Sequence, residues 1–219
     1  MKKLFKKAMI TMCSAVMLMG ISAVGANAAT VEVGDFTVEK SGYGSSLKVS
    51  IAKYTGTDGK ITLPTTAKFG ETEYAITSVG AAFTANEIIT DVVIPEGYDT
   101  VSLSAFANCP NLKGVSIPGT MSMIAASAFK DCPKLETVTF AGSDESSLRF
   151  RNDVFAGCTS LTSIELPKQL SSVDNNFLRG CTSLTSISVA DGSENFAADG
   201  NILYDVSGEG AVMTAYPFG

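Results

Sequence analysis

Cysteine is the residue type in this chain that is best suited to chemistry, because a thiolate can attack an electrophile or bind a metal ion. Cys13 lies in an apolar N-terminal stretch, and the other four follow at intervals of 23, 26 and 23 residues: Cys109, Cys132, Cys158 and Cys181. These four lack the nearby second cysteine of a CxxC motif. We interpret them as buried thiols that pack within a repeat; disulfides between adjacent repeats, and metal or catalytic use, are the alternatives.

Histidine-dependent catalysis is excluded, because the chain contains no histidine. This removes Ser-His-Asp and Cys-His nucleophilic systems, histidine metal sites and the usual proton shuttle near neutral pH. A glycosidase or polysaccharide lyase is the enzymatic alternative, since it could use paired carboxylates, or an aspartate with an arginine or lysine. It would need acidic residues at matching positions of neighbouring repeats, where only Glu165 is acidic. We predict no catalytic residue, no metal site and no cofactor.

Two acidic segments lie outside this pattern. Asp144 and Glu145 belong to a three-residue insertion, which is either a solvated loop or a contact for a cation or a partner. The segment Asp191-Gly192-Ser193-Glu194-Asn195 is similar in composition to a calcium-binding loop. It lacks the glycine at the sixth position of that loop and the glutamate at the twelfth, so we predict a turn.

Small hydroxyl side chains occupy most of the strand positions that we expect to face solvent. The candidate ligand-binding residues are Ser116, Thr137, Thr139, Ser163, Glu165, Ser186 and Ser188. An extended face of this kind suits a protein partner, although hydroxyl side chains also serve β-propensity and solubility. The chain contains no tryptophan, so stacking on a glycan would depend on tyrosines such as Tyr98, Tyr204 or Tyr216.

The residues that could position this face recur along the chain. Phe106, Phe129 and Phe155 are each followed by a cysteine three residues later and by a leucine six residues later. Leu178 takes the phenylalanine position in the next copy, and a degenerate earlier copy begins at Phe83. Repetition at this length is typical of a solenoid, in which each unit covers the apolar face of its neighbour.

Two periods are mixed within one repeat. The spacing of three between phenylalanine, cysteine and leucine predicts a short helical or 3-10 turn, and the alternation of Val115 with Ile117 predicts a strand. Pro118 should end the pairing of that strand, because proline lacks an N–H group. A second inward-facing segment is expected at Ile124, Phe150 and Val173. We predict a parallel β-strand stack of about five coils.

These positions resemble the BspA-like, or Treponema-type, leucine-rich repeats of bacterial surface and secreted proteins. The family unit looks like I-x-x-x-A-F-x-x-C-x-x-L-x-x-V-x-I-P, and the segments 104–118 and 124–132 follow it closely. The resemblance covers about residues 61–190, with departures at Asn86, Ala141 and Leu178. It implies a leucine-rich-repeat solenoid and adhesion to host matrix proteins or to other bacteria.

Four segments can be distinguished. Residues 1–28 carry four lysines, an apolar run and an A-x-A site, which predicts a secretory signal peptide rather than a membrane anchor. Residues 29–75 alternate apolar and polar side chains and predict a β-rich cap with the first strands. The repeats occupy 76–190. Residues 191–219 resemble a variant terminal repeat, with no polar cap evident, which suggests either a fragment of a longer array or an exposed last strand.

The charge of the chain limits its partners. Without residues 1–28 it carries 12 basic and 22 acidic residues, a net charge of −10. Nucleic acids and anionic lipid surfaces are therefore unfavourable partners, and no second membrane-spanning segment is expected. We predict a secreted or cell-surface, non-enzymatic binding or adhesion module, with a protein partner favoured and a glycan left open. A carbohydrate-active enzyme and a structural spacer are the alternatives.

Overall fold

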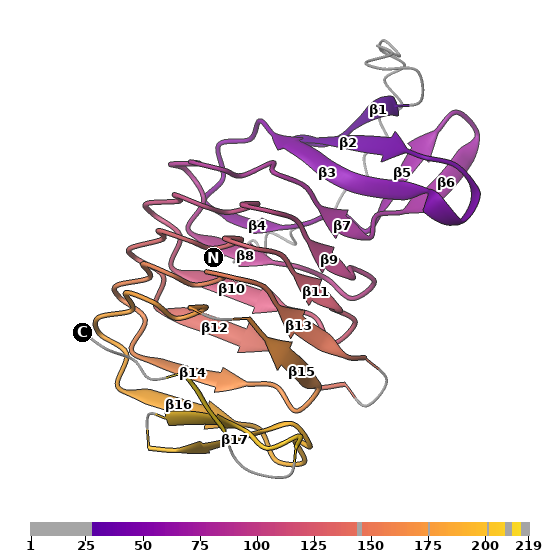
Figure 1. Ribbon diagram of the computed structural model, residues 1–219. Helices are drawn as coiled ribbons and strands as arrows, with labels where there is room; N and C mark the ends of the chain where they lie inside the picture. Colours follow the sequence, from indigo (N-terminus) through magenta and orange to yellow (C-terminus); the bar gives the residue numbers. More distant parts are fainter. Residues whose placement is uncertain (1–27, 144–145, 175, 201, 209–211, 216–219) are drawn as a thin grey trace, which may run out of the picture.

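The fold is a stack of coils between two groups of antiparallel strands (Figure 1). The computed structural model describes residues 28–143, 146–174, 176–200, 202–208 and 212–215. Within these ranges the helical content is one short 3-10 segment, η1 (Gly44–Ser46). The predicted solenoid of stacked parallel strands is confirmed.

One side of the stack, which we call the first sheet, carries one strand from each coil and is divided into two parallel ladders. The four-stranded ladder contains β4 (Lys60–Thr62), β8 (Asp91–Val93), β10 (Gly114–Ile117) and β12 (Thr137–Phe140), and the two-stranded ladder contains β14 (Ser163–Leu166) and β16 (Ser186–Val189). Val115 and Ile117 are buried and Ser116 is half-buried, so the predicted alternation is present. Ala141 stands where other repeats have proline, and its N–H donates to the carbonyl oxygen of Ile117 at 2.9 Å. A proline could not make this bond.

The second parallel sheet lies on another side of the coils. It contains β7 (Ser78–Val79), β9 (Thr100–Val101), β11 (Met123–Ile124), β13 (Leu148–Phe150) and β15 (Leu170–Val173). Ile124 and Phe150 are fully buried and Val173 is partly buried against the core. The second inward-facing segment is therefore present at its predicted positions.

The turns between coils differ from the predicted short helical segment. Backbone hydrogen bonds of the 3-10 type do form, in which an N–H donates to the carbonyl three residues earlier, as from Ala107 to Ser104 at 3.1 Å. However, Ser104 and Asn108 have left-handed φ angles of 54° and 60°. A left-handed residue breaks a right-handed helix, so the chain continues as successive turns. These turns bond to the next coil, for example from Phe106 N–H to Ala128 O at 2.8 Å.

Phenylalanine rings form a continuous column through the interior. The aromatic column contains Phe83, Phe106, Phe129 and Phe155, all fully buried. Successive rings are stacked, with centroid distances of 4.8, 5.1 and 5.4 Å and interplanar angles of 12° or less. The predicted alignment of equivalent side chains at neighbouring levels is confirmed.

The four repeat cysteines form a second internal column, the thiol column. All four are buried and free. Each Sγ donates to the carbonyl oxygen of a phenylalanine in the preceding coil, as from Cys132 to Phe106 at 3.1 Å and from Cys181 to Phe155 at 3.1 Å. Burial raises the pKa of Cys158, and raises that of Cys181 to about 11. The favoured interpretation as buried thiols agrees with this arrangement, and the raised pKa values of Cys158 and Cys181 leave those two residues little thiolate for nucleophilic chemistry.

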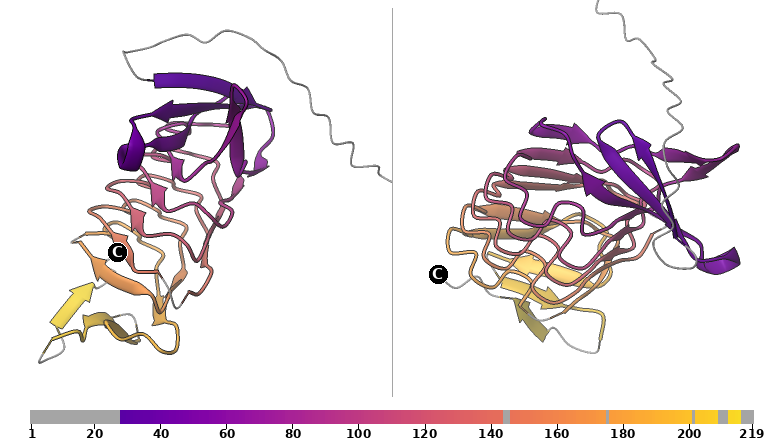
Figure 2. Two further views of the ribbon diagram at one scale, coloured as in Figure 1. Left: turned by 90° about the vertical axis from the view of Figure 1, so that its right-hand side faces the viewer. Right: turned by 90° about the horizontal axis from the view of Figure 1, so that it is seen from above.

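Antiparallel strands precede the stack (Figure 2). They are β1 (Ala28–Val33), β2 (Phe36–Ser41), β3 (Lys48–Tyr54) and the hairpin β5 (Thr66–Phe69) and β6 (Thr72–Ala75). Strand β3 pairs in parallel with β7. The strands β1–β3 and the second parallel sheet therefore form one eight-stranded sheet. The region 29–75 is thus β-rich as expected, but its strand β4 already belongs to the first repeat sheet.

Three antiparallel strands follow β16 in the segment that resembles a variant terminal repeat. Strands β17 (Phe196–Asp199), β18 (Ile202–Asp205) and β19 (Val212–Ala215) form an antiparallel sheet beside β16. Phe196 and Leu203 are buried in the core, and Asn195 Nδ2 donates to the carbonyl of Leu170 at the edge of β15, at 3.2 Å. β16 is therefore covered by the strands that follow it.

Candidate binding face

The outward positions of the first sheet form a solvent-facing surface, which we call the strand face. Strand register sets these positions in two columns on β4, β8, β10 and β12. The first column is Lys60, Asp91, Gly114 and Thr137, and the second is Thr62, Val93, Ser116 and Thr139. The structure thus brings together three of the predicted site residues, Ser116, Thr137 and Thr139.

The other predicted site residues lie on a separate part of the face. Ser163 pairs with Ser186, and Glu165 with Ser188, on β14 and β16. These two strands form their own sheet, with no ladder between β12 and β14. The interruption accompanies the 26-residue repeat. The predicted continuous hydroxyl ladder is therefore divided into two blocks.

Two of the threonine hydroxyls also contact the backbone of the preceding coil. Thr137 Oγ1 and Thr139 Oγ1 each lie 3.4 Å from a carbonyl oxygen of the preceding strand, those of Lys113 and Val115. Both threonines remain exposed. Their hydroxyl protons are directed along the stack, and their oxygen lone pairs remain free to accept a hydrogen bond from a ligand.

Four residues of the strand face were missed by the sequence analysis: Lys60, Thr62, Asp91 and Val93. The ammonium group of Lys60 lies 3.6 Å from Asp91 Oδ2, and Val93 is 43% exposed. Pro95 carried a signal for two of them, because it marks the end of a strand on which Asp91 and Val93 alternate with buried Val92. The first repeat lacks its cysteine, which obscured the register of β4.

The carboxylates of the strand face are not arranged as a catalytic pair. Asp91 lies on β8 and Glu165 on β14, in separate ladders with β10 and β12 between them, and three strand spacings of about 4.8 Å would already separate the two strands by about 14 Å. Paired carboxylates of glycosidases are about 5–9.5 Å apart. The described residues also contain no group of three or more His, Cys, Asp or Glu side chains that could hold a metal ion.

The remaining sequence candidates do not join the face. Tyr98 is fully buried and donates to the carbonyl of Pro64 at 2.6 Å, so the expectation that it could stack on a glycan is wrong. The segment at Asp191 forms the predicted turn. Asp144, Glu145 and Tyr216 lie outside the described residues, as do residues 1–27 of the predicted signal peptide. In the part of the chain that is described, no helix is long and apolar enough to cross a membrane.

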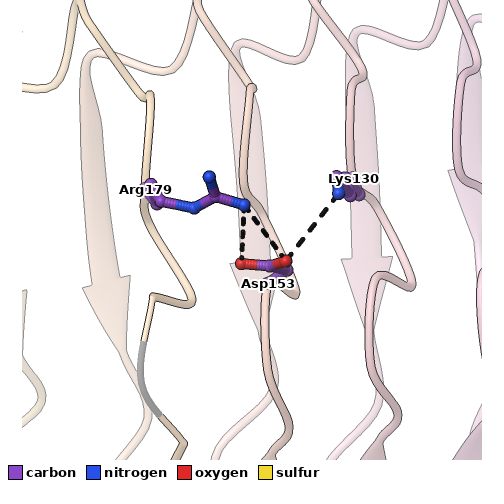
Figure 3. Close-up of polar contacts among 3 residues, drawn as sticks. All are labelled: Lys130, Asp153 and Arg179. Atoms are coloured by element: carbon purple, nitrogen blue, oxygen red, sulfur yellow. Dashed lines mark hydrogen bonds and ion pairs between the residues drawn. The ribbon is translucent and has the colours of Figure 1, made fainter.

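Charged side chains form a separate ladder on the turns (Figure 3). Asp153 lies between two cations from neighbouring coils, with Lys130 Nζ at 3.8 Å from Oδ2 and Arg179 Nη2 at 3.3 Å from both carboxylate oxygens. We call these three residues the ion-pair ladder. Because Lys130 and Arg179 belong to the coils on either side, the ladder joins three coils without contributing to the strand face.

Comparison with known proteins assigns this architecture. A family model described as "BspA type Leucine rich repeat region" matches residues 77–200 in 6 copies, which is more than half of the chain. Comparison with curated proteins finds no significant match.

Two solved structures are similar in fold. A leucine-rich repeat protein of T. pallidum has a TM-score of 0.61 at 22% identity, over 72% of this chain and 70% of that one. The pneumococcal vaccine antigen PcpA has a TM-score of 0.58 at 20% identity, over 81% of this chain. This chain spans 54% of the length of the pneumococcal protein.

Proposed function

This chain belongs to the BspA-type leucine-rich repeat family, and from that premise we propose that it is an exported binding module that presents the strand face to a protein partner. Proteins of this family are repeat-based surface modules, and leucine-rich repeats generally serve as scaffolds for protein interactions. The partner that we favour is a host matrix protein or a bacterial surface protein.

The observation that carries this proposal is the composition of the strand face in its register. Two aligned columns combine small hydroxyls, one ion pair and one exposed apolar side chain, that of Val93. Such a surface is open along its length and offers hydrogen-bonding groups at regular intervals. An extended, rigid face of this kind is what solenoids use for macromolecular partners.

Export and the absence of catalysis are part of the same proposal. The lysine-rich start, the apolar run and the A-x-A site support secretion. The wide separation of Asp91 and Glu165 argues against the glycosidase alternative. The net charge of −10 calculated without residues 1–28 favours basic surfaces over nucleic acids and anionic lipids.

The test is a binding assay of residues 29–219 against purified extracellular-matrix proteins, glycan arrays and whole bacterial cells. Thr139→Arg with Ser163→Arg should weaken capture of the partner, because both side chains point outward and arginine is bulky and charged. Thr72→Arg with Ser45→Arg, at exposed sites on β6 and η1 away from the strand face, is the matched control.

Each outcome of this assay has a consequence. If the double variant at Thr139 and Ser163 loses capture and the control double variant keeps it, the strand face is supported as the binding surface. Equal capture by both pairs would place the binding surface elsewhere. No capture by the unmodified chain would favour the structural spacer, for which the bonds of Thr137 and Thr139 to the preceding strand are the supporting observation.

A further inference from the structure

A notch interrupts the first column of the strand face at Gly114. Register places Asp91 and Thr137 on either side of this glycine. A Cβ added to Gly114 would lie 3.1 Å from Asp91 Oδ1 and 3.0 Å from Thr137 Oγ1. Two oxygen atoms therefore converge on a strip of backbone that has no side chain. We call Asp91, Gly114 and Thr137 the Gly114 notch.

The backbone conformation gives no reason for a glycine here. Gly114 lies within β10 and is not among the residues with positive φ. A glycine inside a strand weakens it, and it often marks a place where a ligand or another backbone approaches closely. Any other residue would place its Cβ against the two oxygens.

The notch presents acceptors and no free donor. Asp91 Oδ2 accepts from Thr90 Oγ1 at 2.8 Å and lies 3.6 Å from Lys60 Nζ. Among the described residues, Asp91 Oδ1 receives no hydrogen bond. Thr137 Oγ1 lies 3.4 Å from the carbonyl oxygen of Lys113, to which its hydroxyl can donate weakly while its lone pairs accept from a ligand. A ligand group that contacts both oxygens must donate hydrogen bonds. Because one of the two acceptors is a carboxylate, a cationic donor is favoured.

We propose that the Gly114 notch receives a lysine side chain of the protein partner. The inference rests on the proposed function and specifies the chemical group that the strand face recognises. Only one oxygen of Asp91 is free, which suits the compact ammonium group better than the two-pronged guanidinium of arginine. Val93 lies two residues beyond Asp91 on the same side of β8 and offers apolar contact for the lysine methylenes.

Lys60 is a competitor for the same carboxylate. Its side chain is 83% exposed and its contact with Asp91 is long, so the ion pair is weak. Removing its charge should make Asp91 more attractive to an incoming cation. Binding should therefore tighten in Lys60→Met and weaken in Asp91→Asn, two changes of opposite sign in one ion pair.

The experiment is an NMR titration of residues 29–219 with the tripeptide acetyl-Gly-Lys-Gly-amide. A matched peptide replaces lysine with norleucine, which keeps the methylenes and removes the charge. The amide signals of Asp91, Gly114 and Thr137 should shift with the lysine peptide only. Gly114→Ala should weaken binding about tenfold, as expected for the loss of one charged hydrogen bond.

Gly142→Ala is the control for that substitution, because an added Cβ there meets nothing within 4 Å and the φ is not left-handed. It should bind within twofold of the unmodified chain. Equal binding of the two peptides, or unchanged binding in Gly114→Ala, would overturn the inference. If capture of the whole partner is lost in the Thr139 and Ser163 double variant but kept in Gly114→Ala, the strand face stands and the notch does not.

Discussion

The central coils and the last coil keep the same backbone while their interiors differ. In the centre, Phe129 stacks between two other rings, whereas the last coil has Leu178 at the equivalent position. Even so, the thiol bonds of Cys132 and Cys181 have the same length of 3.1 Å. The thiol hydrogen bond therefore forms whether phenylalanine or leucine occupies the position three residues before the cysteine.

The largest loss of stability is expected when an aromatic ring is removed from the central coils. Phe129→Ala should lower the free energy of unfolding by about 3–5 kcal/mol, because it leaves a cavity in a fully buried column. Leu178→Ala should cost less, about 2 kcal/mol, since Leu178 lies at the end of the stack. Urea unfolding followed by circular dichroism measures both. Equal losses would mean that the aromatic column contributes nothing special to the centre.

The thiol bonds should also differ between the two regions. Phe106 O accepts from Cys132 Sγ and has no other donor among the described residues, whereas Phe155 O accepts from Cys181 Sγ and also from Cys158 N–H at 3.2 Å. Cys132→Ala should cost about 1–3 kcal/mol, because it leaves a buried carbonyl unpaired.

Cys181→Ala should cost less than Cys132→Ala in the same urea experiment. Cys132→Ser is the control, since a hydroxyl can still donate to Phe106 O. A serine variant as unstable as the alanine variant would show that packing of the sulfur, and not its hydrogen bond, stabilises the coil.

Alkaline pH should destabilise the thiol column, to which the last coil contributes Cys181. Burial raises the pKa of Cys181 from about 9 to about 11 in the folded chain. A raised folded-state pKa gives stability that is complete below pH 9 and is lost as the pH rises through 11. At pH 10 the loss should be about 1 kcal/mol, and Cys181→Ala should reduce the slope of stability against pH between 9 and 11. An identical slope in that variant would contradict the assignment.

The smallest effect is expected at the ion-pair ladder. Asp153→Asn should cost about 0.5 kcal/mol at low salt and almost nothing at 1 M salt, because exposed ion pairs are weak and screened. Asparagine suits the left-handed φ of 58° at this site, since Asn176 has a φ of 66° at the equivalent position of the next coil. A salt-independent loss in urea unfolding would point to strain in the turn.

The sequence predicted the interior better than the ends. Phe, Cys and Leu recur in fixed positions, so alignment of the coils placed them in columns, and alternation around Val115 predicted the buried strand face. The left-handed turns were missed although one of their positions is occupied by residues that favour this conformation, Asn108, Asp131, Gly157 and Gly180; the other position is less clear, because Ser104 and Ser127 are ordinary residues there. The antiparallel strand β17 begins at Phe196, 23 residues after Val173, so the repeat pattern continued past the point where the fold changes.

The sequence predicted part of the strand face, because the repeat pattern sets the outward positions of its clearest copies. Ser116, Thr137 and Thr139 follow from the repeat, and the structure places them together. Asp91 was missed although Pro95 marks the end of its strand, because the candidate residues were taken only from the copies that begin at Phe106 and later. The role of Gly114 depends on the side chains of two neighbouring strands, and a single sequence does not show which residues lie beside it.

The interruption between β12 and β14 has a mechanical consequence. At this boundary the first sheet contributes no ladder, and the second sheet contributes the pair β13 and β15, which contains a bulge. The contact of Lys130 with Asp153 spans the same boundary on the turns. Between β8 and β12 both repeat sheets pair, whereas here the coils are joined by the second sheet and by turn bonds such as that from the N–H of Phe129 to the carbonyl of Val154 at 2.9 Å. If coils separated at this boundary, the four-stranded part of the strand face would stay whole.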